Sequence, residues 1–263
     1  MPGVPSVRFF SLVTAAAMSL GCKTTQALDD RGRFVEDGVT LDAKDDWGGE
    51  PIAIDNTGVT ATGGLSVAAD GERTKIGAIA RLLALRDTLD KPGADDAIVK
   101  AKGTFLITTS TAEPKATTVV CGAVAGTGED SAGCDALDIT VPAGKPEMPL
   151  TLQARSGNGK VGISLAPAAV KGLDLTASNG SIDVAVPSNA GAVISLVAAT
   201  GDDVVLRLPR DFAADSITLE TTGAIDTRAF PDVQSGKGRG AAGAGAKSIA
   251  VRSSRGRISL VAQ

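Results

Sequence analysis

The sequence has 263 residues, a formal net charge of −4 and 43% hydrophobic residues. This length suits one large domain or two small ones, and the acidic balance, without a basic cluster in any folded-looking segment, argues against a nucleic-acid partner. The chain contains no histidine, no tyrosine and a single tryptophan. That composition excludes Ser-His-Asp and Cys-His catalysis and histidine-ligated zinc or copper sites.

The first residues have the pattern of an export signal. One positive charge, at Arg8, precedes the mostly apolar run 9–20, which is too short to span about 30 Å of hydrocarbon as a helix. Residues 19–22, Ser-Leu-Gly-Cys, resemble the lipobox at which bacterial lipoprotein signal peptidase cuts before the cysteine. We therefore expect 1–21 to be a signal peptide and Cys22 to carry lipid. The alternative is an ordinary signal peptide with an unrelated cysteine.

Lipid on Cys22 would make a membrane the first partner of the mature chain. Several acyl chains give stable attachment, since each buried methylene contributes about 0.8 kcal/mol. Lys23 stands where, by resemblance to lipoproteins of two-membrane bacteria, aspartate would signal retention, so we expect the outer membrane. Removal of the signal peptide with Arg8 takes the formal charge from −4 to −5. The mature chain is thus predicted in the cell envelope, anchored by its lipid alone.

Two segments follow in chain order. The segment 22–50 is rich in Asp, Lys, Gly and Thr without a sustained apolar period, which predicts a flexible tether. The remainder, 51–263, is predicted to be one β-strand-repeat domain. Within it, 75–90 suits either a helix or a buried strand, and its pattern leaves the choice open.

The remaining cysteines, Cys121 and Cys134, enclose twelve residues rich in glycine and small side chains. In an exported protein, such a pair predicts a disulfide. Closing this loop in the unfolded chain is worth about 3 kcal/mol. A redox role would require a shorter spacing such as Cys-x-x-Cys and a polarising neighbour, and the sequence has neither.

The second half of the chain repeats itself. Five segments share the order strand, small polar turn, glycine, strand, and they are 150–165, 173–186, 194–206, 217–227 and 249–260. Their turn glycines are Gly159, Gly180, Gly201, Gly223 and Gly256, at spacings of 21, 21, 22 and 33 residues. The last spacing contains the glycine-rich insertion 236–245. A period near 21 is typical of the coils of a solenoid.

Apolar and polar residues alternate on both sides of each turn, which predicts strands with one buried face. Glycine permits the positive φ of a tight corner, and the Ser, Thr or Asn before it can bond to local backbone. One repeat cannot bury its apolar face alone, whereas several stacked repeats can. We therefore predict an all-β fold, a β-solenoid or β-helix-like stack of roughly 21-residue repeats. The alternative is an antiparallel β-sandwich.

These repeats resemble the putative adhesin family of bacterial envelope proteins over residues 137–263. The resemblance rests on the repeated corner and on the strand endings Val186-Pro187 and Leu208-Pro209. It implies a sheet-rich or β-helical fold and no established enzymatic activity.

Three motifs suggest other chemistry and are set aside. The Gly-x-Gly-x-x-Gly match at 238–243 precedes a strand rather than opening a helix, so dinucleotide binding is not expected. The same loop contains three basic residues, Lys237, Arg239 and Lys247. We expect them to be solvated; the alternative is that they contact an acidic polymer. The pairs Asp45-Asp46 and Asp202-Asp203 could bind calcium, but strand neighbours point to opposite faces. We predict no metal site and no cofactor.

The leading functional hypothesis is a lipid-anchored envelope or surface scaffold, adhesin-like and without catalysis, whose further partner is a protein or a polysaccharide. The first alternative is a carbohydrate-active β-helix enzyme, which would need clustered acids on one face. The second is a binding module that pairs through an exposed sheet edge, with the terminal strand 247–260 as the candidate.

Overall fold

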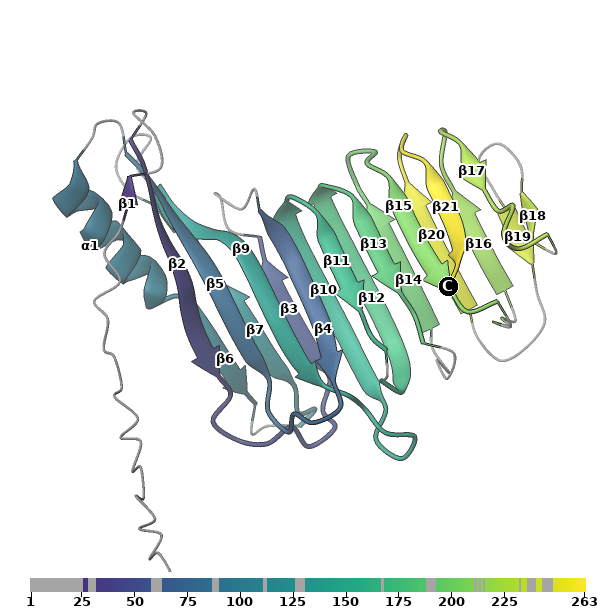
Figure 1. Ribbon diagram of the computed structural model, residues 1–263, viewed down its shortest axis with the longest axis horizontal. Helices are drawn as coiled ribbons and strands as arrows, with labels where there is room; N and C mark the ends of the chain where they lie inside the picture. The colour runs from purple at the N-terminus through teal and green to yellow at the C-terminus, as the bar shows by residue number, and fades with distance from the viewer. Residues whose placement is uncertain are drawn as a thin grey trace, which may run out of the picture.

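The computed structural model describes most of the chain after the predicted signal peptide. The described residues are 26–27, 32–57, 63–86, 90–110, 113–125, 131–166, 168–187, 193–210, 212, 214, 216–231, 233–235, 240–242 and 248–263. Two large mixed sheets face each other across a common core, and a helix lies at one end of the stack (Figure 1). The predicted all-β class is confirmed.

Sheet A has eleven strands and sheet B has ten. In spatial order, sheet A contains β1 (Gln26–Ala27), β2 (Arg33–Asp42), β5 (Gly77–Leu85), β9 (Ser131–Pro142), β4 (Gly64–Asp70), β11 (Val161–Ser164), β13 (Ile182–Ala185), β15 (Val204–Leu208), β21 (Ile258–Ala262) and β17 (Ile225–Asp226), with β8 (Val124–Ala125) paired to β9. Sheet B contains β18 (Gln234–Ser235), β19 (Gly240–Ala242), β16 (Ser216–Glu220), β20 (Ser248–Ser253), β14 (Val193–Ala198), β12 (Val170–Asn179), β10 (Leu150–Asn158), β3 (Ile52–Asn56), β7 (Thr117–Cys121) and β6 (Phe105–Thr109).

Each predicted repeat contributes one strand to each sheet, and equivalent residues of neighbouring repeats pair in parallel. Leu152 pairs with Leu173, Leu173 with Ile194, and Ile194 with Ile249. These four side chains are buried in one core with their counterparts from sheet A. The repeat strands therefore pair with one another in parallel, whereas the antiparallel alternative predicts antiparallel pairs between them; the antiparallel partner of β16 is β19, from the insertion. A 21-residue unit brings each strand back beside its predecessor in the same direction, which antiparallel hairpins do not do.

The parallel stack extends into the first half of the domain. Strands β3 and β4 pair with β10 and β11, and β7 and β9 pair in turn with β3 and β4. Segment 75–90 contains a strand, since β5 pairs antiparallel with both β2 and β9.

The last repeat does not take the last place in space. Strand β20 lies between β14 and β16, and β21 lies between β15 and β17 (Figure 1). The prediction that 247–260 forms an exposed sheet edge is therefore wrong, because β20 and β21 are each paired with a strand on both sides. The 33-residue spacing from Gly223 to Gly256 gives the chain the length to leave the fourth repeat and place the fifth between the third and the fourth.

The prediction that 22–50 is a flexible tether is wrong for the residues from Arg33 onward. β2 begins there and is bonded to β5, and Phe34 is buried in the core. The indole of Trp47 is also buried and donates to the Glu50 carbonyl oxygen at 2.7 Å. Because the apolar residues of β2 are few and flanked by charges, the sequence pattern resembles a linker, while neighbouring elements supply the remainder of the burial.

One helix, α1 (Lys91–Lys102), lies at the end of the stack formed by β2 and β6 (Figure 1). The Asp90 side chain caps it by accepting from the Gly93 amide. Ala94, Ile98 and Ala101 are its buried residues, at the spacing that lines one helical face. At its C-terminal end, Lys102 pairs with the buried Glu36 at 2.8 Å. Within the described ranges, no helix is long and apolar enough to cross a membrane.

Candidate functional site

The corner glycines form a stacked row along one side of the repeats. A Cβ at Gly180 would collide with the carbonyl oxygen of Gly159, one at Gly256 with that of Asp202, and one at Gly223 with that of Arg255. Neighbouring corners are therefore packed backbone against backbone, which only glycine permits.

Backbone conformation explains only part of the glycine pattern. Gly159 and Gly201 have φ values of 78° and 99°, as the tight-corner hypothesis predicts. Gly180, at 159°, is nearly extended. For Gly223 and Gly256 the prediction of positive φ is wrong, because neither adopts it. These last three positions require glycine because the next corner leaves no room for a side chain.

Small polar side chains complete the corners, as predicted. The Ser253 hydroxyl accepts from the Gly256 amide and donates to the Asp202 carbonyl, both at 2.9 Å. The Thr221 hydroxyl accepts from the Gly223 amide at 2.9 Å and donates to the Gly256 carbonyl at 2.8 Å. Each hydroxyl thus bonds one backbone donor and one backbone acceptor of the corners, which ties neighbouring corners together.

The predicted disulfide between Cys121 and Cys134 is confirmed. Cys121 ends β7 in sheet B and Cys134 belongs to β9 in sheet A, with 5.8 Å between their Cα atoms. Both residues are buried in the core. The bond therefore ties the two sheets together close to α1, where the parallel repeats give way to antiparallel strands.

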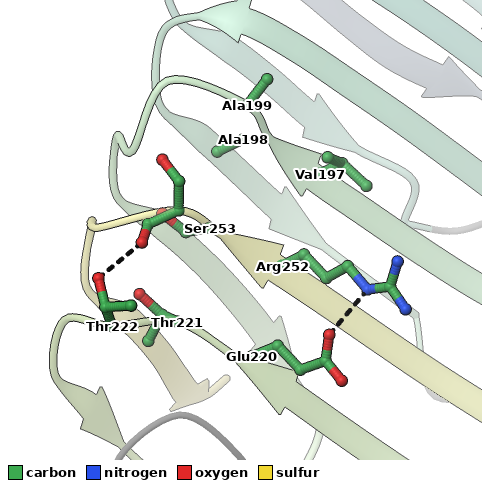
Figure 2. A pocket seen from close by; sticks show the side chains of 9 residues that line it. Val197, Ala198, Ala199, Glu220, Thr221, Thr222, Arg252 and Ser253 are labelled. Carbon is green, nitrogen blue, oxygen red and sulfur yellow. Dashed lines mark hydrogen bonds and ion pairs between the residues drawn. The ribbon is translucent and has the colours of Figure 1, made fainter.

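A hollow of about 550 Å³ opens where β14, β20 and β16 reach their corners. Figure 2 shows Val197, Ala198 and Ala199 along one wall, and Glu220 with Arg252 along the other. The hollow exists because the side chains of the first wall are short, and the longer side chains of Glu220 and Arg252 form its opposite border.

The charged wall combines one cation with one anion. Arg252 Nε contacts Glu220 Oε2 at 3.1 Å, and the Arg252 side chain is 65% exposed. This contact uses Nε, so the two terminal guanidinium nitrogens remain outside it. The hydroxyls of Thr221, Thr222 and Ser253 donate to backbone carbonyls of the corners. The hollow therefore offers the Arg252 guanidinium, the Glu220 carboxylate and the Ser254 hydroxyl beside an apolar wall.

The register of sheet B explains why these residues meet. Val197 pairs with Arg252, which pairs with Glu220, and all three are fourth in their repeats when the repeats begin at Ile194, Ile217 and Ile249. Sequence reasoning missed the hollow, although opposite charges at equivalent positions of two repeats were a signal. Spatial neighbours could not be assigned, because the last repeat lies inside the fourth.

The outer side of sheet A has a charged cluster of its own. Asp183 accepts from Arg207 at 2.9 and 3.3 Å and from Lys160 at 3.1 Å. The hydrogen bond from Arg207 is the main reason that the pKa of Asp183 lies below its ordinary value. Further along the sheet, hydrogen bonds from the Arg228 side chain and backbone lower the pKa of Asp226 from 3.8 to about 2.

We expect Arg228→Ala to raise the pKa of Asp226 from about 2 toward 3.8, because the guanidinium bonds are lost while the backbone bond remains. Titration of the carboxyl ¹³C signals by NMR measures this change, with Asp183 as the internal control. Since the folded-state pKa is the lower one, the pair stabilises the fold above about pH 4 and loses that contribution as the pH falls through about 2. A variant that still titrates near 2 would show that another group is responsible.

The other predicted sites have different outcomes. Cys22 lies outside the described residues, as do Lys237, Arg239 and Lys247 and all of the glycine-rich insertion except Gly240–Ala242. Asp203 accepts from the Arg257 amide at 2.7 Å, and Asp202 accepts from the Thr200 hydroxyl at 3.0 Å. In the described part of the chain, no group of three or more His, Cys, Asp or Glu residues is placed to hold a metal ion.

No family model and no curated protein matches the chain. The fold is similar to the crystal structure of a protein from Clostridium sporogenes that is described as a putative cell adhesion protein. The two structures align with a TM-score of 0.55 and 11% sequence identity, over 86% of this chain and 100% of the other. At this identity the similarity shows a shared fold, and that fold covers nearly all of the chain.

Proposed function

We propose that this protein is a lipid-anchored scaffold of the bacterial envelope, whose stacked repeats form a β-solenoid and display contact surfaces without catalysis. The observation that carries the proposal is the parallel register from β7 through β3, β10, β12 and β14 to β20. Such a stack buries one continuous core and leaves long outer faces for contact.

An adhesin-like role agrees with two further observations. The structure that shares this fold is described as a putative cell adhesion protein, and the repeats resemble the adhesin family on their corners and strand endings. A protein or polysaccharide at the surface is the partner class that we propose. The hollow beside Arg252 and Glu220 offers such a partner charged groups next to an apolar wall.

The proposed location is supported by the pattern of the first 23 residues. The export pattern, the cysteine at position 22 and Lys23 after it support lipid attachment and the outer membrane of a two-membrane bacterium. The structure fits this setting, because a disulfide between buried cysteines is stable where thiols are oxidised.

Replacement of Cys22 by serine tests the anchor. We expect wild-type protein isolated from native-host membranes to show a diacyl or triacyl mass on Cys22 in intact mass spectrometry. Cys22→Ser should lack this mass and leave the membrane fraction, because the lipid is the proposed attachment. In both proteins, reduction should add two hydrogens at Cys121 and Cys134, which is the control for export. An unlipidated, soluble wild-type product would refute the proposal.

A panel of envelope and host polysaccharides tests the absence of catalysis. The domain should bind members of the panel or ignore them, without changing their chain length. Reproducible cleavage would overturn the scaffold proposal in favour of the carbohydrate-active alternative.

A further inference from the structure

One end of the stack differs from the remainder of the surface. We call β1, β2, β6 and α1 the α1 end, because these elements lie together at one limit of the long axis (Figure 1). Within the described part of the chain, four large hydrophobic side chains are exposed, Ile79, Val99, Leu106 and Val193. Val99 and Leu106 belong to α1 and β6, and Ile79 belongs to β5, the strand next to β2, so three of the four lie at or beside this end.

Single exposed hydrophobic residues are common on proteins, so a second observation has to identify what covers them. The length of chain before β1 supplies it. Cys22 precedes Gln26, the first residue of β1, by four positions, and four residues reach at most about 14 Å even when fully extended. β1 pairs with β2 at the edge of sheet A. A lipid on Cys22 would therefore hold this end close to the bilayer surface.

From this juxtaposition we propose that the α1 end rests on the headgroup region of the membrane that holds the lipid of Cys22, with Val99 and Leu106 facing it. The inference depends on the proposed lipid anchor and adds an orientation to it. The charge of α1 does not explain why this end would face the membrane, because the helix carries three lysines and two aspartates and is nearly neutral. The short chain between Cys22 and β1 and the exposed apolar side chains are the reasons for the proposed orientation.

This orientation places the candidate contact site away from the membrane. In sheet B, β20 lies six strands from β6, and strands are about 4.8 Å apart, so Arg252 lies roughly 29 Å along the sheet from the α1 end. The hollow would then be held clear of the membrane surface, where a partner can reach it.

The experiment uses the full lipidated chain in vesicles of phosphatidylethanolamine and phosphatidylglycerol with a fraction of nitroxide-headgroup lipid. Val99→Cys and Val193→Cys each introduce a free thiol for a fluorophore, because Cys22 carries lipid and Cys121 is bonded to Cys134. Val193 is the matched control, since its exposed fraction of 62% is close to the 64% of Val99 and it lies in β14. We expect several-fold stronger quenching at position 99 than at position 193.

Three outcomes would overturn the orientation. Equal quenching at both positions, with a lipid mass on Cys22, refutes it and leaves the anchor intact. Self-quenching at position 99 that increases with protein density shows that a second copy covers this end. Absence of lipid on Cys22 refutes both the anchor and the orientation. Mass spectrometry of the same sample distinguishes the last outcome from the other two.

Discussion

Gly180→Ala is expected to lower the free energy of unfolding by about 3 kcal/mol, because its new methyl group would overlap the carbonyl oxygen of Gly159. That oxygen belongs to the backbone of the preceding corner, so neither corner can yield without disturbing its stacking. Denaturant unfolding, followed by circular dichroism, measures the change.

Gly162→Ala is the matched control for this prediction. Gly162 lies in β11, and a Cβ there would meet nothing within 4 Å. Its backbone is not left-handed, so alanine should be neutral or stabilise the protein by up to about 1 kcal/mol. If both variants unfold at the same denaturant concentration, the corners are not packed as tightly as described.

Loss of the Cys121–Cys134 disulfide is expected to cost about 3 kcal/mol, since thirteen positions separate the two residues and the closed loop restricts the unfolded chain. Reduced wild-type protein and the double variant Cys121→Ala with Cys134→Ala should unfold at similarly lowered urea concentrations. The double variant separates the cross-link from thiol chemistry, because it leaves no buried thiol at either site. Equal midpoints for oxidised and reduced wild-type protein would contradict the prediction.

The repeat signal predicted more of the fold than any single motif. Residues such as Leu173 and Leu175 alternate with polar neighbours, and this alternation identifies strands and their buried faces because strand side chains point to opposite sides in turn. The corner glycines also located the turns. A period, however, gives the length of a repeat and not its neighbour in space, so the position of β20 between β14 and β16 could not be predicted.

The α1 end could not be predicted for a different reason. Its elements lack a strong period of their own, since α1 buries mainly Ala94, Ile98 and Ala101. β2 has a short apolar core that includes Phe34 between charged residues. Such segments are stabilised by what they pack against, and a sequence pattern does not contain that information. The candidate hollow depends on the same long-range information, because its walls come from three separate repeats.

The placement of the final repeat makes the fold sensitive to the end of the chain. The chain is synthesised from its N-terminus, so β16 and β17 become available before β20 and β21. Until the last residues arrive, the growing edges at β14 and β15 lack their final partners. A chain cut before Ser248 would thus lose the anchoring of the fourth repeat as well as the fifth. Proteolysis or early termination near the C-terminus should therefore remove two repeats at once.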